Sequence, residues 1–335
     1  MPNSSGYFAP DAPDAVTMAA PRRPLIPPWQ ATDPCPCGSG RRFDACCLAG
    51  GELRKRLPRL LPPPPITGYA HPRCYLHSTN DCSTKISSEH FISKNVLEAM
   101  QGEIEFGGLP WIEPGTTVTY GINSLASNIL CKRHNEALSP LDTEAGRIFR
   151  SLQDICLNLS PKTKSLSRKG RWFLVSGQAL ELWCLKTLFG VFHAKLASRQ
   201  GERLIETHTL DPAPFLAALE SHSLPSPCGL YLRATQGGVI SGIDEKVTAV
   251  PIGDEEKKAL IGIRIGMMGF EFDVLMQPGE IDFAALARET VYHPWQLLFK
   301  NRMRQHMVAM TWADPTSAAT VVEFATYRDA ARPMQ

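Results

Sequence analysis

The sequence predicts an α+β fold in which two small cysteine-bearing modules precede a region of helices and mostly antiparallel β-strands. Three observations predict this fold. Cysteines and histidines gather in two short segments of the first half of the chain, apolar residues recur at helical spacing from about residue 144, and they alternate beyond about residue 225. At 335 residues, the chain has room for about two domains of ordinary size with cores of their own.

The composition limits the classes of function. With 43% apolar and 20% charged residues the chain has the make-up of a soluble globular protein, and its net charge of +2 is too small to indicate nucleic acid by itself. No window approaches the roughly 18 apolar residues of a membrane span, and the N-terminus lacks the apolar core of a signal peptide. We therefore expect a cytoplasmic protein without membrane contact, whose ten cysteines are thiols or metal ligands rather than disulfides.

Changes in composition divide the chain into six segments. Residues 1–33 are rich in Pro, Ala, Ser and Asp, which is typical of a disordered arm. A basic stretch that ends in four consecutive prolines predicts a stiff linker holding the two cysteine-bearing modules apart. That linker covers residues 50–68 and follows the first cysteine module at 34–49. The other segments are a second Cys/His module at 69–145, a helical segment at 146–200 and a mainly β C-terminal domain at 201–335.

The first cysteine cluster lies in the stretch DPCPCGSGRRFDACC, residues 33–47, with the spacing C-x-C-x8-C-C. Two thiolates at each end of the loop can close around one tetrahedral zinc, and the glycines allow the tight turn that this requires. A full set of four thiolates leaves no position for water, so we expect a structural site rather than a catalytic one. Free or disulfide-bonded thiols remain the alternative. The four expected ligands are Cys35, Cys37, Cys46 and Cys47.

This stretch resembles the SEC-C zinc motif. All four cysteine positions, the GSG that follows the second cysteine and the basic-basic-aromatic run after it agree with that motif. The resemblance implies a structural zinc and a module that docks onto a protein partner.

A second candidate zinc site is spread over residues 74 to 134. Cys131 and His134 are separated by two residues, the spacing of a zinc knuckle. Their partners would be Cys74 together with either Cys82 or His77. We favour Cys82 because thiolates hold zinc strongly, and we keep His77 as the alternative; buried thiols without metal are the second alternative.

Four polar residues interleave with this second site, and they suit phosphodiester hydrolysis. That reaction needs a base to activate water, a divalent cation to stabilise the developing charge, and a group that orients the base. A histidine with an ordinary pKa of about 6.5 is largely neutral at neutral pH and can act as the base. The candidates lie in STKISSEHFIS and SNILCKRHN and are Glu89, His90, Asn128 and Asn135.

The arrangement resembles the HNH endonuclease family, which has the ββα-metal fold. The resemblance implies that His90 is the general base and that Asn128 orients it, while Glu89 and Asn135 hold one Mg²⁺ or Mn²⁺ ion. It also implies that the zinc at Cys74, Cys82, Cys131 and His134 is structural. The expected function is metal-dependent cleavage of nucleic acid, with DNA favoured over RNA.

Two departures from the family pattern support an alternative. An inserted hairpin, GEIEFGGLPWIEPGTTVTYGI, separates His90 from Asn128, and Glu136 stands where a basic residue often follows the last Asn. The alternative is a non-enzymatic two-zinc adaptor with a degenerate HNH-like scaffold that binds a protein or nucleic-acid partner. His90 would then be an ordinary buried histidine, and Asn135 would cap a helix.

Basic residues in and after the second module favour nucleic-acid binding, because such charges can contact phosphates. They are Lys85, Lys94, Lys132, Arg133, Lys162, Lys164, Arg168, Lys169 and Arg171, with Trp172 as a candidate for stacking on a base.

The second half of the chain predicts core-facing helices followed by strands. SGQALELWCLKTLFGVFHAKLASR carries apolar residues at helical spacing, with Ser176 as the expected N-cap. In LIGIRIGMMGFEFDVLM the apolar residues alternate on both sides of a Gly-Met-Met-Gly turn, which predicts two half-buried strands. Weaker strand candidates are CGLYLRA, KVTAVPI, HMVAMTWA and TVVEFATY.

Overall fold

A computed structural model describes most of the chain. The fold combines helices and strands, which confirms the α+β class. Residues 1–27 of the arm expected at 1–33, and the basic stretch at 160–169, lie outside the described residues. The described ranges are 28–100, 104–159, 170–194, 198–199, 202–233, 239–240, 246–254, 256–267, 269–279, 281–301, 304–313 and 320–326.

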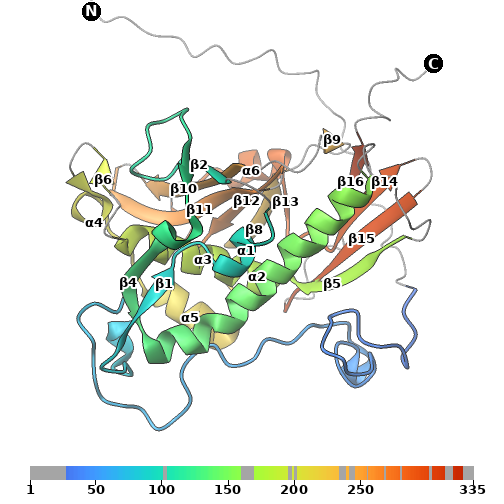
Figure 1. Cartoon of the computed structure of the whole chain (residues 1–335), viewed down its shortest axis with the longest axis horizontal. Coiled ribbons are helices and arrows are strands. Elements are labelled where there is room, and N and C mark those ends of the chain that lie inside the picture. Colours follow the sequence, from blue (N-terminus) through green and yellow to red (C-terminus); the bar gives the residue numbers. More distant parts are fainter. Residues whose placement is uncertain are drawn as a thin grey trace, which may run out of the picture.

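Two long helices form the middle of the molecule (Figure 1). Helix α2, Lys132–Leu159, is amphipathic, whereas α3, Gly177–His193, is buried along almost its whole length. Ser176 caps α3 by accepting a hydrogen bond from the backbone of Ala179, as the sequence predicts. In the described part of the chain, no helix is long and apolar enough to cross a bilayer. The shorter helices are α1 Lys94–Leu97, α4 Leu204–Thr207, α5 Ala213–Ser221 and α6 Phe283–Glu289, with 3-10 turns at Ala49–Gly51, His77–Thr79 and Ile122–Leu125.

Strands β1, Ile86–His90, and β4, Ala126–Cys131, form a small antiparallel sheet that leads directly into α2. Along β1 the pairing advances two residues from Ser87 to Glu89, while along β4 it advances three, from Leu130 to Ser127. This β-bulge places one extra residue of β4 in the ladder, next to the candidate catalytic pair. The result is a compact strand, strand and helix unit that carries all four candidate catalytic residues.

The insertion between β1 and β4 is part of a larger sheet. Its strands β2, Ile104–Gly107, and β3, Val118–Tyr120, pair with each other, and β2 also pairs in parallel with β10, Lys246–Asp254. The resulting seven-stranded sheet has the order β13-β8-β12-β11-β10-β2-β3, so the segments at 69–145 and 201–335 share it. Its other strands are β8 Gly229–Arg233, β11 Ala259–Met267, β12 Phe270–Leu275 and β13 Thr290–Tyr292.

The C-terminal region contains a second sheet that the sequence analysis did not separate from the first. The predicted hairpin is confirmed, because β11 and β12 pair antiparallel within the seven-stranded sheet. Among the described residues, the five-stranded sheet, β5-β15-β14-β16-β9, has three parallel ladders and one antiparallel ladder. The expectation of mostly antiparallel pairing is therefore wrong for this sheet. Its strands are β5 Trp172–Ser176, β9 Val239–Ile240, β14 Gln296–Asn301, β15 Arg304–Thr311 and β16 Val321–Thr326; β6 Ser198–Arg199 and β7 Glu202–Arg203 form a separate pair.

Within the residues that the structure describes, the first cysteine module packs against the outer face of the five-stranded sheet and not against the second Cys/His module. Residues of the strands alternate between two clusters: Leu297 and Phe299 of β14 belong to the main core, while Leu298 between them contacts the cysteine module. Arg147 of α2 also donates a 2.6 Å hydrogen bond to the carbonyl of Pro36. In Figure 1 this module lies beside β5, on the other side of the view from β1 and β4.

Candidate metal centres and an adjoining polar pocket

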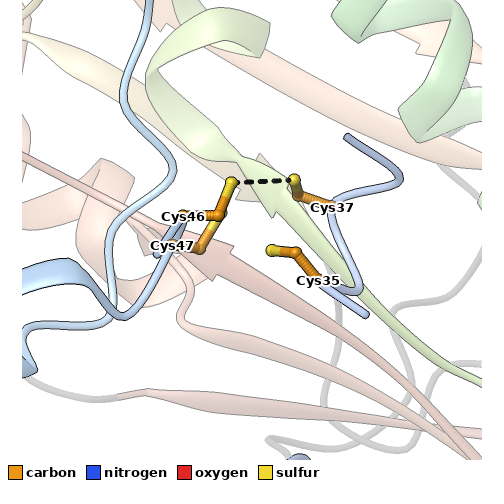
Figure 2. A group of neighbouring side chains, drawn as sticks. All are labelled: Cys35, Cys37, Cys46 and Cys47. Carbon is orange, nitrogen blue, oxygen red and sulfur yellow. Dashed lines mark hydrogen bonds between the residues drawn. The ribbon is translucent and has the colours of Figure 1, made fainter. Parts of the chain in front are cut away.

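The first cysteine cluster has the dimensions of a tetrahedral metal site. All four sulfurs lie within 4.8 Å of one another, and Figure 2 shows Cys37 and Cys46 pointing toward each other. Tetrahedral zinc with Zn–S bonds of about 2.3 Å separates sulfurs by about 3.8 Å. The Cys37–Cys46 and Cys46–Cys47 sulfur distances are 3.7 and 3.9 Å. Gly38 and Gly40 have φ angles of +72° and +74°, which L side chains rarely adopt, so both glycines are needed for this loop.

The electrostatics of this cluster also favour a cation. Hydrogen bonding between Cys37 and Cys47 lowers the pKa of Cys37 to about 3 and, together with burial, raises the pKa of Cys47. Burial raises the pKa of Cys35 as well. One thiolate therefore forms easily, and its negative charge opposes ionisation of its neighbours. A divalent cation at the centre removes that repulsion and allows four thiolates to coexist.

The second cluster lies in the main core and joins Cys74, Cys82, Cys131 and His134. The distances from His134 Nδ1 to the sulfurs of Cys131, Cys74 and Cys82 are 3.1, 3.6 and 3.7 Å. Zinc bonds of about 2.0 Å to nitrogen and 2.3 Å to sulfur give about 3.5 Å in a tetrahedral site. All four ligand atoms lie within 4.8 Å of one another, so the geometry fits zinc.

Thr79 orients His134 toward the three sulfurs. The Thr79 hydroxyl donates its proton to the carbonyl of Leu76 at 2.8 Å, so its oxygen accepts from His134 Nε2 at 3.1 Å. The imidazole then carries its proton on Nε2, which leaves the Nδ1 lone pair for the metal. An oriented imidazole of this kind is the usual outer-shell arrangement of zinc-binding histidines.

His77 takes no part in this cluster. Its side chain is exposed, and its Nδ1 lies 2.9 Å from the carbonyl oxygen of Cys74 rather than near the sulfurs. Cys82, which we favoured over His77, is buried and within reach of His134. The Cys74–His77 contact instead stabilises the 3-10 turn His77–Thr79 that carries Thr79.

A polar pocket of about 260 Å³ adjoins the second cluster, where the end of β1 meets α1 and α2. Three of the four candidate catalytic residues line it, and α2 adds a carboxylate that the sequence analysis did not single out. The lining residues used below are Glu89, His90, Lys94, Asn135, Ser139 and Asp142. The pocket is large enough for several water molecules or for a phosphate group, since one water occupies about 30 Å³ of liquid.

His90 lines this pocket and has one nitrogen without a hydrogen-bond partner among the described residues. The side chain is half-buried, and its Nε2 atom is buried without a hydrogen-bond partner in the described structure. Burial lowers the pKa of His90, and the nearby charges of Lys94 and Lys186 lower it further, while Asp142 opposes them. The imidazole is therefore neutral at neutral pH and can accept a proton.

Glu89 and Asp142 are joined by Lys186 of α3. The buried ammonium donates to Glu89 Oε1 and, at 2.7 and 2.9 Å, to both carboxylate oxygens of Asp142. Burial raises the pKa of Glu89, and Asp142 raises it further, whereas Lys186 opposes both effects. Burial alone would lower the pKa of Lys186, but the two carboxylates outweigh it and hold that pKa above its ordinary value.

The two asparagines have different surroundings. Asn135 lines the pocket and donates from Nδ2 to Ser87 Oγ at 2.7 Å, which leaves its amide oxygen for a ligand. Asn128 is exposed on β4 and does not line the pocket. Its backbone carbonyl oxygen accepts a 3.3 Å hydrogen bond from the Arg73 guanidinium. The structure therefore brings Glu89, His90 and Asn135 together without Asn128.

Two signals in the sequence pointed to the residues that were missed. Asn135, Ser139 and Asp142 are spaced i, i+4 and i+7, so they share one face of α2. Lys186 is the one lysine of a helix, Gly177–His193, that is mostly apolar on all sides, and such a helix is buried. A lysine there needs a carboxylate partner, because unpaired charges are almost never fully buried.

Together the fold and these sites define an α+β protein with two Cys/His clusters suited to zinc. The SEC-C motif family matches residues 32–49, which confirms the resemblance of the first cluster. No curated protein and no solved structure matches the chain.

Proposed function

We propose that the chain is a metal-dependent hydrolase of nucleic-acid phosphodiesters with an HNH-like site, and that DNA is the favoured substrate. The observation that carries this proposal is that His90 lines a polar pocket together with Glu89 and Asn135, while its buried Nε2 has no hydrogen-bond partner among the described residues. A neutral imidazole with a free nitrogen, next to oxygen donors, suits activation of water.

In this proposal His90 Nε2 takes a proton from the water that attacks phosphorus, and the bond from phosphorus to the leaving oxygen breaks. A divalent cation, when bound, stabilises the charge on the phosphate and on the leaving oxygen. The donor set fits Mg²⁺ or Mn²⁺, because carboxylate and amide oxygens are the ligands that these ions prefer. Glu89 and Asn135 would hold it, with the Asn135 amide oxygen left over by its bond to Ser87.

The proposal gives the zinc clusters structural roles. The knuckle formed by Cys131 and His134 lies at the junction of β4 and α2, directly beside the strand that carries Glu89 and His90. Zinc there would fix the helix against the strands and so fix Asn135 against His90. Lys94, exposed at the pocket, supplies positive charge for a phosphate.

The test is cleavage of supercoiled plasmid, single-stranded DNA and RNA by the zinc-loaded full chain, with Mg²⁺ or Mn²⁺ added. We expect His90→Ala to lower the rate by at least 10²-fold, because general-base catalysis contributes about that much or more. His208→Ala, at a half-buried histidine outside this pocket, is the matched control and should cleave like the wild type. Zinc content by elemental analysis should be equal in all three proteins. Full cleavage by His90→Ala would overturn the role of His90.

The alternative function is a two-zinc adaptor that binds a protein or nucleic-acid partner. A specific observation favours it: Glu89 is only 5% exposed and already pairs with Lys186. The adaptor predicts no metal-stimulated cleavage of any of the three substrates, together with partner binding that does not depend on Mg²⁺. Since the SEC-C module packs on the five-stranded sheet, a protein partner would contact its remaining exposed face, which includes Arg41 and Arg42.

A further inference from the structure

Lys186, from outside the strand, strand and helix unit, pairs with two carboxylates that line the polar pocket, Glu89 and Asp142. It lies on α3, and its side chain is 4% exposed, as buried as the core around it. All three protons of its ammonium are used, because it contacts one oxygen of Glu89 and two of Asp142. The ammonium therefore has no N–H donor left for another group, and its positive charge is paired with these two carboxylates.

The network extends one step further into the core. Ser93 donates its hydroxyl proton to Asp142 Oδ1 and accepts a 2.5 Å hydrogen bond from the indole of Trp183. Trp183 and Lys186 lie three residues apart on α3 and so share a face of that helix. Helix α3 thus holds Asp142 directly through Lys186 and indirectly through Trp183 and Ser93, and it holds Glu89 through Lys186.

The charges of the network sum to one excess negative charge, carried by carboxylates that line the pocket. Two carboxylates and one ammonium leave that excess, and the facing groups from α1 and β1 are Lys94 and the neutral His90. Glu89 Oε1 is occupied by Lys186, so any ligand must be met by the other oxygen. Because Lys186 holds one oxygen of the Glu89 carboxylate, the direction in which the other oxygen points is fixed.

We propose that Lys186, together with Asp142, is a positioning residue that holds the Glu89 carboxylate in place for a divalent cation in this pocket. The inference rests on the proposed function, and it adds that the catalytic unit is incomplete without α3. Lys186 itself acts through Glu89 and does not contact the cation.

The test measures Mn²⁺ binding by electron paramagnetic resonance, and cleavage in parallel, on the zinc-loaded full chain. We expect Lys186→Met to weaken Mn²⁺ binding by about 10- to 100-fold, as loss of an outer-shell partner does. Lys186→Arg keeps the charge and should restore most of the binding. Lys55→Met is the matched control, since it removes another buried lysine, one that pairs with Glu144 away from the pocket. It should bind Mn²⁺ like the wild type.

A second variant covers the case in which Lys186→Met does not fold. Lys186→Met/Asp142→Asn removes one charge of each sign, so it keeps the net charge of the network, and it should also lose Mn²⁺ binding. Unchanged or tighter Mn²⁺ binding in either variant overturns the proposal; tighter binding would mean that the ammonium occupies the place of the cation. A wild type that binds Mn²⁺ in a Lys186-dependent way but cleaves nothing overturns the nuclease and keeps the positioning role. A wild type that does not bind Mn²⁺ overturns the positioning role.

Discussion

Thr79 illustrates how a single hydroxyl group selects the tautomer of a candidate metal ligand, His134. Because its proton is used on the Leu76 carbonyl, its oxygen can only accept from His134 Nε2. The imidazole is thereby fixed with Nδ1 toward three sulfurs before any metal arrives. This pre-orientation matters most in a buried site, where an imidazole that rotates must break a hydrogen bond that no water replaces.

We expect Thr79→Val to weaken zinc binding at the second cluster by about 10- to 100-fold, the usual effect of removing an outer-shell partner. The measurement is competition with a chromophoric chelator at neutral pH, read as the zinc lost from each of the two sites. Thr116→Val is the control, because the Thr116 hydroxyl makes a similar bond to a backbone carbonyl far from either cluster. Equal zinc affinity in Thr79→Val and in the wild type would contradict the assignment.

At the scale of elements, the first cysteine module covers part of one face of the five-stranded sheet. The outer face of the five-stranded sheet presents a row of apolar side chains that strand alternation directs away from the main core. These side chains are Leu174, Leu298, Met307, Ala309 and Val321. Phe43 of the module packs against them and stacks edge-to-face on Trp29, with ring centroids 5.7 Å apart. Zinc at this module would therefore stabilise the sheet as well as the loop.

Phe43→Ala should lower the free energy of unfolding by about 3–5 kcal/mol, the cost of removing a buried phenylalanine from a core. Urea denaturation followed by tryptophan fluorescence measures it, since Trp29 and Trp172 both pack in this cluster. Ile66→Ala, at a side chain 72% exposed, is the control and should change the free energy by less than about 0.5 kcal/mol. A small effect of Phe43→Ala would mean that the module is only loosely attached.

The elements that could be predicted from the sequence are those whose determinants are local. The two zinc clusters depend on ligand spacing, the β11–β12 hairpin on alternation around a glycine turn, and the start of α3 on its Ser176 cap. The pairing of β2 with β10 could not be predicted, because strands far apart in sequence carry no mark of their partner. The contact of Lys186 with Glu89 could not be predicted for the same reason. A lysine in a mostly apolar, buried helix indicates only that it has a carboxylate partner somewhere in the fold.

At the scale of the whole molecule, the segments of the chain share one core and one large sheet and do not form separate domains in a row. One continuous core runs from Leu60, in the linker, to Phe324, in the last described strand. The linker itself is held by Arg133, which pairs with Asp81 and donates to the carbonyl of Pro65 at 2.9 Å. The second Cys/His module contributes two strands to the seven-stranded sheet and receives Lys186 from α3. Its own strand pair is too small to bury a core alone.

The shared core and sheet predict that residues 50–159, expressed alone, do not fold even with zinc. The fragment would leave β2 without β10 and the buried carboxylates of Glu89 and Asp142 without Lys186. Removing one partner of a buried pair costs about 3–5 kcal/mol, which is a large share of the stability of any small domain. Far-UV circular dichroism and amide NMR dispersion with one equivalent of zinc are the measurements, with the full chain as control. A dispersed spectrum and a cooperative melt of the fragment would show instead that the module is autonomous, so that α3 only adjusts a site which exists without it.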